Sequence, residues 1–262
     1  GVGARREAMG NVRSDRIILM STGAASAVQS SIGKDILPLI HDLPGIRRDA
    51  EGRPMAAAQA FLFTQARKKG TGDAMGFALI GVTAGLAGIQ PELHLTSGRM
   101  FQPGLHELIA SNRCARQFSD FAVGDKRVMR GSEWVVVGNF NLGSSEGACV
   151  VFGDAATVLS AFRINTYNQV TALLQSPGAF TQLTDALKAN PTVPVEAKRE
   201  AEVAERNPQN ALKRLQAGSR VADLQGHQLR DRGVRPGAAA GAGLAGLNRC
   251  NCDITLELIR LI

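Results

Sequence analysis

The sequence predicts an α+β fold, in which a split β-α-β subdomain with two helices on one sheet is interrupted by an inserted β-rich subdomain. Three observations predict it: a β-α-β pattern near the start, a second such pattern at residues 170–200, and a stretch of strands and glycine turns between them. With 262 residues and 44% hydrophobic composition, the chain can bury a substantial core.

The first β-α-β unit begins with "IILMS", a short apolar run at residues 17–21 that predicts a buried strand. Ser30 and Ser31 can cap a helix over residues 32–43, where isoleucine and leucine recur at helical spacing. Pro44 and Gly45 end this helix, and residues 55–65 return as a second strand.

The closing unit repeats this order. Residues 170–175 ("VTALLQ") predict a strand, and the next segment predicts a helix with Ser176 at its N-cap. Residues 193–200 ("VPVEAKRE") then predict the returning strand, so we expect both helices to cover one face of one sheet.

The inserted part contains mainly predicted strands and glycine-containing turns. "KKGTGDAMGFALIGV" places a glycine-rich turn before an extended run, and "GDKRVMRGSEWVVVGNF" predicts a hairpin that turns at Gly131-Ser132. "GRMFQPGLHELIASNRCARQF" predicts a turn, a strand and a short helix, and "GACVVFGDAATVLSAF" predicts a strand followed by a helix capped by Asp154.

These patterns divide the chain into an N-terminal linker, a folded body and a tail, with the bounds 1–13, 14–202 and 203–262. Within the body we expect the β-α-β subdomain at about 14–67 and 166–202, and the β-rich subdomain at about 68–165. The tail is rich in Arg, Gly and Ala, so we expect it to be unstructured or weakly helical. The net charge of +7 comes mostly from the two ends, because residues 14–198 hold 17 basic and 15 acidic residues.

The sequence predicts no catalytic, cofactor-binding or metal-binding residues and no cofactor. His106 and Glu107 would point to opposite faces at a strand entrance, and Cys114 has no identifiable base. "GAGLAG" at residues 241–246 matches a dinucleotide motif but lacks the preceding strand and the acidic residue ~20 positions later. No phosphate loop is present, and no pair of histidines has metal-ligand spacing among His41, His94, His106 and His227.

Two features have competing interpretations. We expect Cys114 and Cys149 to be buried small hydrophobic residues in preference to a disulfide, and Cys250 and Cys252 lack a second ligand pair for zinc. The turn at residues 68–72 ("KKGTG") could bind an anion through its backbone N–H groups, although a solvated hairpin tip is the commoner meaning.

Together, "SDRIILMSTGAASAVQSSIGKDILPLIHDLPG", "KKGTGDAMGFALIGV", "LHLTSGRMFQPGLHELIASNRCARQF", "VGDKRVMRGSEWVVVGNF" and "GDAATVLSAFR" resemble the MacB-like periplasmic core domain of bacterial ABC-transporter permeases of the MacB and FtsX type. The resemblance runs in order from about residue 14 to residue 202. It implies a domain inserted between the first and second transmembrane helices of an inner-membrane permease, on the periplasmic side.

The resemblance further implies a non-catalytic role in transmembrane export, with ATP hydrolysed by a separate ABC ATPase subunit. The partners it implies are that ATPase, a second permease copy and a periplasmic fusion protein or cargo, with no nucleic acid. Members of this family continue through a helix into a membrane span, whereas this sequence becomes Arg/Gly/Ala-rich near Val203. We therefore expect a shifted reading frame or a truncation at that point.

Two other function classes stay open at this stage. One is a soluble α+β ligand-binding protein or enzyme with a pocket between the two subdomains. The other is nucleic-acid binding through the basic tail, which the 5% aromatic content disfavours.

Overall fold

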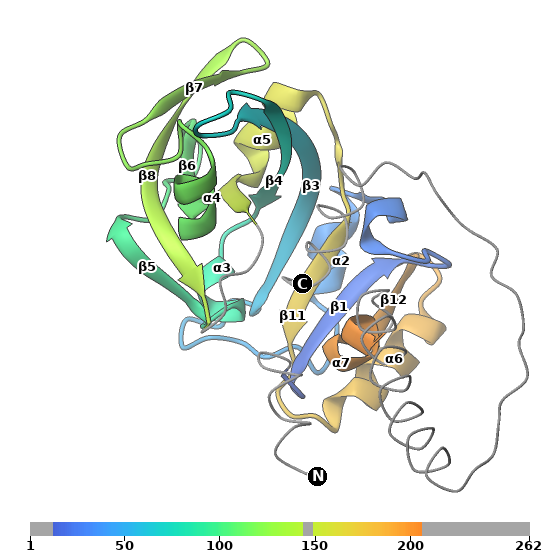
Figure 1. Ribbon diagram of the computed structural model, residues 1–262. Helices are drawn as coiled ribbons and strands as arrows, with labels where there is room; N and C mark the ends of the chain where they lie inside the picture. The colour runs from blue at the N-terminus through green and yellow to red at the C-terminus, as the bar shows by residue number, and fades with distance from the viewer. Residues whose placement is uncertain (1–12, 144–148, 206–262) are drawn as a thin grey trace, which may run out of the picture.

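The computed structural model describes residues 13–143 and 149–205 (Figure 1). One ten-stranded sheet runs through the described chain in the order β12-β1-β11-β3-β4-β9-β6-β8-β5, and β7 pairs with β8. The strands are β1 (Arg16–Ser21), β2 (Ile32–Gly33), β3 (Ala56–Arg67), β4 (Ala74–Val82), β5 (Leu93–Gly98), β6 (Glu107–Ser111), β7 (Lys126–Met129), β8 (Ser132–Leu142), β9 (Val150–Asp154), β10 (Thr166–Tyr167), β11 (Gln169–Leu173) and β12 (Val195–Arg199). The helices are η1 (Ala27–Gln29), α2 (Ile36–His41), α3 (Leu86–Ile89), α4 (Asn112–Gln117), α5 (Ala155–Phe162), α6 (Ala179–Ala189) and α7 (Glu200–Glu205).

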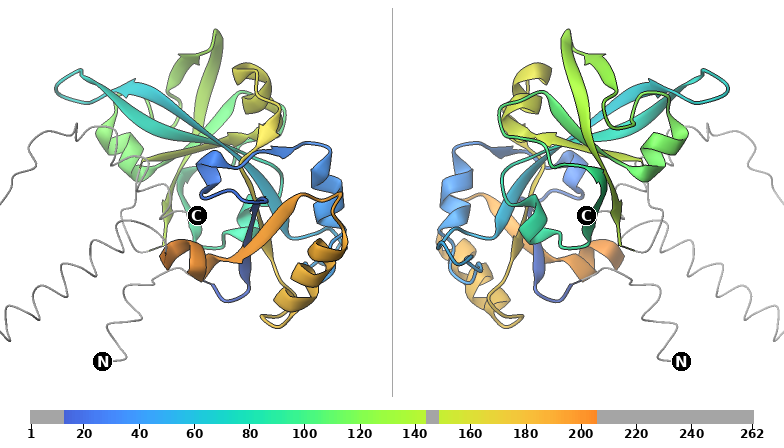
Figure 2. Two further views of the ribbon diagram at one scale, coloured as in Figure 1. Left: turned by 90° about the vertical axis from the view of Figure 1, so that its right-hand side faces the viewer. Right: turned by 90° about the vertical axis from the view of Figure 1, so that its left-hand side faces the viewer.

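The two terminal units form the predicted sheet with two helices on one face. β1 lies between β11 and β12 and is antiparallel to both, and β11 is in turn antiparallel to β3. The helices α2 and α6 lie on the same side of this part of the sheet (Figure 2). Their buried residues Ile40, Leu183 and Leu187 share one hydrophobic core with Ile17 and Leu19 of β1. Both faces of β1 are buried, which explains its continuous apolar run.

Both helices begin later than the sequence predicts. Residues 32–33 pair with residues 166–167 as the short β2–β10 ladder, and α2 starts only at Ile36. The expected N-cap Ser176 is wrong, because Gly178 occupies that position and the Ser176 carbonyl accepts a hydrogen bond from the Ala179 N–H. Neither α2 nor α6 has a side-chain hydrogen bond that caps its N-terminus.

The other half of the sheet is β-rich, as predicted, and carries a core on each face. The core on one face includes Phe140 and Phe152, and the core on the opposite face includes Trp134, Phe77 and Phe118. The side chain of Asp154 caps α5 as expected, because it accepts a hydrogen bond from the Thr157 N–H at 3.0 Å.

The hairpin formed by β7 and β8 turns one residue earlier than the sequence predicts. Arg130 and Gly131 occupy the turn with φ of 51° and 79°, and Ser132 already belongs to β8. Two consecutive positive φ values are typical of the tight turns that match strand twist, which is why glycine is favoured at the second position.

The β3–β4 hairpin connects the two halves of the sheet. Its register runs from the pair Gln59–Val82 to the pair Arg67–Ala74.

The boundaries between subdomains at about residues 67/68 and 165/166 remain our proposal. The short helix α7 follows the last strand, β12, and the rest of the predicted tail lies outside the described residues, together with the "GAGLAG" motif, His227, Cys250 and Cys252. In residues 13–143 and 149–205, no helix combines the length and apolarity that crossing a membrane requires.

Candidate functional site

A buried, highly charged site in the described chain centres on Arg16, the first residue of β1. Its side chain is only 6% exposed. It lies on the sheet face opposite the α2 and α6 helices, because it precedes Ile17, whose side chain packs against them. A buried guanidinium must be matched by acceptors, since desolvation of an unpaired charge is costly.

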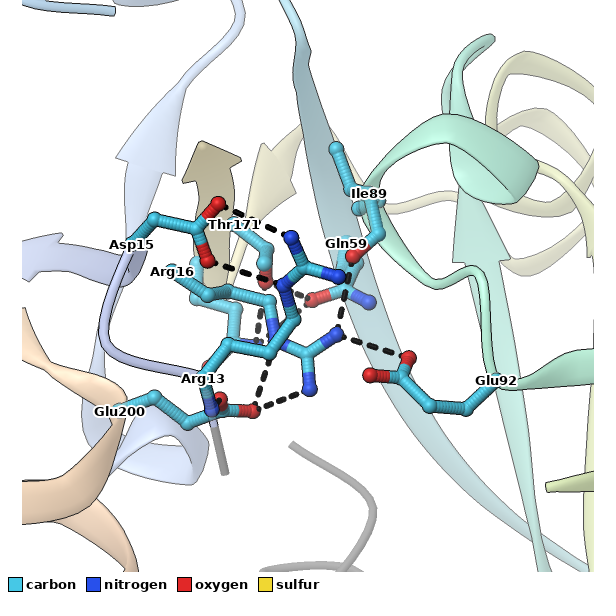
Figure 3. A network of polar contacts seen from close by, with 9 residues as sticks. Arg13, Asp15, Arg16, Gln59, Ile89, Glu92, Thr171 and Glu200 are labelled. Atoms are coloured by element: carbon cyan, nitrogen blue, oxygen red, sulfur yellow. Dashed lines mark hydrogen bonds and ion pairs between the residues drawn. The ribbon is translucent and has the colours of Figure 1, made fainter. Parts of the chain in front are cut away.

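Two carboxylates from distant parts of the chain supply those acceptors (Figure 3). The Arg16 Nε donates to Glu200 Oε1 at 2.8 Å, and Nη2 lies 2.8 Å from the same oxygen. The Arg16 Nη1 donates to Glu92 Oε2 and to the Ile89 carbonyl, each at 3.0 Å. One side chain thus ties β1 to the start of α7 and to the segment between α3 and β5.

A second layer of contacts involves Arg13, which reaches the same cluster. Its backbone N–H donates to Glu200 Oε2 at 2.7 Å, and its side chain makes a two-point contact with Asp15, with both distances 2.9 Å. Arg47 donates to Asp15 at 3.0 Å. The cluster therefore contains three arginines and three carboxylates, namely Arg13, Arg16, Arg47, Asp15, Glu92 and Glu200, and its formal charge is zero.

Burial and pairing act in opposite directions on these carboxyls. Burial raises the pKa of Glu200, and the hydrogen bond from Arg16 opposes that shift. The hydrogen bond from Arg13 lowers the pKa of Asp15, which is more accessible to water. A charge-balanced cluster of this kind holds chain segments together.

A polar group on β3 and β11 lies near the Arg16 cluster (Figure 3). Thr171 Oγ1 and Gln169 Nε2 both donate to Gln59 Oε1, at 2.9 and 2.6 Å. All three side chains are buried, and Gln169 Oε1 has no hydrogen-bond partner. This group continues the polar character of the Arg16 face across the middle of the sheet.

The residues that the sequence singled out lie elsewhere and do not converge. β6 begins at Glu107, as expected, and Arg99 Nη1 donates to Glu107 Oε2 at 2.7 Å, which lowers the pKa of that carboxyl. The His106 ring packs edge-on against the Trp134 ring with centroids 4.6 Å apart. The two adjacent side chains therefore have separate partners.

The expectation for the cysteines is wrong, because Cys114 and Cys149 form a disulfide with Cα atoms 4.6 Å apart. Cys114 lies on α4, which follows β6 directly, and Cys149 precedes β9. Since β6 and β9 are antiparallel neighbours, the end of one strand meets the start of the other. The 35-residue separation conceals this proximity in the sequence.

The turn at residues 68–72 is the tip of the β3–β4 hairpin, with the Lys68 N–H donating to the Asp73 carbonyl at 2.9 Å. Across the described ranges, no group of three or more His, Cys, Asp or Glu side chains is arranged to hold a metal ion.

The sequence alone does not reveal the Arg16 cluster. A lone arginine before an apolar strand is ordinarily a solvated strand end, and Glu92 and Glu200 lie 76 and 184 positions away. The one available signal was a charged residue at the start of a strand that is otherwise apolar on both faces.

Comparison with solved structures identifies the architecture. The chain is similar to the extracellular domain of the noncanonic ABC-type transporter YknZ from Gram-positive bacteria, with a TM-score of 0.53 and 15% identity over 70% of this chain and 99% of that one. It is also similar to the periplasmic region of MacB from Actinobacillus actinomycetemcomitans, with a TM-score of 0.53 and 11% identity over 74% of this chain and 94% of that one. No protein-family model and no curated protein matches the sequence. The chain therefore has the fold of a MacB-like periplasmic domain.

Proposed function

We propose that this chain is the extracytoplasmic domain of an ABC-transporter permease. In this role it performs no chemistry of its own. It connects the membrane part of the permease, and through it a separate ABC ATPase, to a partner protein or cargo outside the cytoplasm. The fold shared with two extracytoplasmic transporter domains supports this proposal.

The observation that carries the proposal is the meeting of the two ends of the folded body. The Arg13 N–H donates to the Glu200 carboxylate, and Arg16 binds the same carboxylate from β1. The chain therefore enters and leaves the fold at one place. This geometry is what a domain inserted between two consecutive membrane helices requires.

The disulfide between Cys114 and Cys149 supports the location. Disulfides persist in oxidising compartments and are rare in the cytosol, where thiols are kept reduced. We infer that the domain faces the periplasm, from a permease in the inner membrane. In the same proposal, the permease works with a second copy of itself and with a periplasmic fusion protein or cargo.

Two measurements test this proposal. The first is the DNA sequence upstream of the codon for Gly1 and across the codons for residues 200–262, translated in all frames. We expect an apolar run of about 20 residues on each side of the domain, enough to span a bilayer. The second is the thiol state of Cys114 and Cys149 in acid-quenched cells, measured by maleimide labelling.

Reduced cysteines in the cell, together with an intact frame and no apolar run, would overturn the proposal. A soluble ligand-binding protein would then become the better explanation, because it needs neither an oxidising compartment nor a membrane anchor.

A further inference from the structure

Basic residues outnumber acidic ones at the end of the described chain remote from the Arg16 cluster. Residues 67–73 and 112–133 contain eight basic and four acidic residues, a net charge of +4. The described residues contain 19 basic and 17 acidic residues in total, a net charge of +2, so the remainder has a net charge of −2. Among the described residues, the excess of basic over acidic residues therefore lies at this end.

Three consecutive cations, Arg67, Lys68 and Lys69, form the centre of this surface, which we call the basic tip. All three are exposed. Arg67 Nη1 donates to the Gly72 carbonyl at 3.2 Å, and Lys69 Nζ donates to the Ala115 carbonyl at 2.7 Å. Within the described chain, no carboxylate forms an ion pair with any of the three.

The basic tip is held in place by contacts that an ordinary solvated hairpin end lacks. The Lys69 N–H donates to the Gln117 carbonyl at 2.9 Å, and Lys68 forms a β-bridge with Phe118. Phe118 is fully buried, so the turn is attached to the core through α4. Backbone attachment lowers the entropic cost of binding at this surface, because the backbone that carries the cations is already ordered.

The position of the basic tip in the molecule limits which binding partners can reach it. The β3–β4 hairpin projects from the body at the end opposite α7 in both side views (Figure 2). Under the proposed function, α7 and β1 face the membrane, so the basic tip points away from the lipid surface. A basic surface that faces away from the membrane is complementary in charge to a carboxylate-rich protein surface.

We propose that the basic tip is a docking surface for an acidic polypeptide segment of a partner protein. The orientation away from the membrane rests on the proposed function, whereas the charge, exposure and attachment of the tip do not. Lysine and arginine at exposed positions attract carboxylates mainly by charge, so the binding should weaken steeply with added salt.

The test uses the full chain and a fluorescent decaglutamate peptide at about 20 mM and about 300 mM NaCl. The variant K68Q/K69Q removes two charges from the basic tip. The matched control K34Q/K188Q removes two charges from exposed lysines next to α2 and on α6. We expect the tip variant to bind the peptide about tenfold more weakly at low salt and the control to change less than about twofold, in line with the worth of two exposed charge pairs.

Carbodiimide coupling of the same peptide, followed by mass spectrometry, locates the contact. We expect cross-links at Lys68 or Lys69 to exceed those at Lys34 and Lys188. Equal weakening in both variants, or cross-links spread evenly over the lysines, would overturn the proposal because the effect would then be one of net charge.

Two further probes separate other partners. Tighter tip-dependent binding to vesicles with about 30% phosphatidylglycerol would replace the protein partner by a membrane, and tighter tip-dependent binding to a ten-nucleotide oligothymidylate would replace it by nucleic acid. Neither result depends on whether apolar runs flank the domain, so failure of this inference is distinguishable from failure of the proposed function.

Discussion

Replacing Arg16 by methionine should destabilise the fold more than any other single change at a charged residue of the cluster. Methionine keeps the apolar stem and much of the volume of the side chain but removes the guanidinium. The Glu200 carboxylate, only 6% exposed, then loses its cationic partner in a buried environment. Glu92, which is 18% exposed, loses its ion pair with Arg16 as well.

Breaking a buried ion pair by removing one partner costs about 3 to 5 kcal/mol, because the other charge stays desolvated. We expect about 3 kcal/mol for R16M, the lower end of that range, because Glu92 can turn toward water. The control R47Q removes an arginine that is 35% exposed and pairs with Asp15 at 3.0 Å. That exposed pair should be worth less than about 1 kcal/mol.

The pH dependence of this loss provides a second check. Burial raises the pKa of Glu200 and the hydrogen bond from Arg16 opposes the rise, so without Arg16 the pKa rises further. A carboxyl whose pKa is higher in the folded than in the unfolded state binds more protons when folded. Protonation of this carboxyl therefore stabilises the fold as the pH falls toward the pKa that the carboxyl has in the unfolded state. The R16M loss should thus be smaller at about pH 5 than at about pH 7.5.

The assay is urea unfolding followed by far-UV circular dichroism, with the disulfide intact, at both pH values. The free energy of unfolding of R16M and R47Q is compared with that of the unaltered chain. A loss below about 1 kcal/mol for R16M, an equal loss for R47Q, or a larger R16M loss at the lower pH would refute the account of a buried, charge-balanced cluster.

Two further predictions concern covalent and backbone constraints. Replacing Cys114 and Cys149 by serine should lower the free energy of unfolding by about 4 kcal/mol, from the entropy of closing a 35-residue loop. Reductant should lower the unaltered chain to the same value in urea titrations. The pair G98A and G104A should differ, because a Cβ at Gly98 would clash with the Val137 carbonyl, whereas one at Gly104 meets open space. Both have positive φ, so thermal melts should show a loss of about 1 kcal/mol for G104A and clearly more for G98A.

Local signals determined most of the elements in the described chain. Apolar runs predict β1 and β3, and the Asp154 cap before α5 is visible because a helix start depends on residues within one turn. The predicted starts of α2 and α6 were wrong because backbone N–H and C=O groups there form hydrogen bonds that the local sequence does not indicate. Ile32 pairs with Tyr167 in place of starting a helix, and α6 begins at Ala179, after the N-cap Gly178, without a side-chain cap.

The sequence by itself determined the fold class and the absence of a recognisable catalytic motif, because both depend on periodicity and spacing over a few tens of residues. Tertiary structure alone decided which distant charges meet. Glu200 meets Arg16, and Cys114 meets Cys149, because antiparallel strands bring their ends together. Glu92 reaches Arg16 because the α3 segment packs over that face of the sheet. The worth of each such contact depends on burial, and burial is a property of the packed sheet that no single segment encodes.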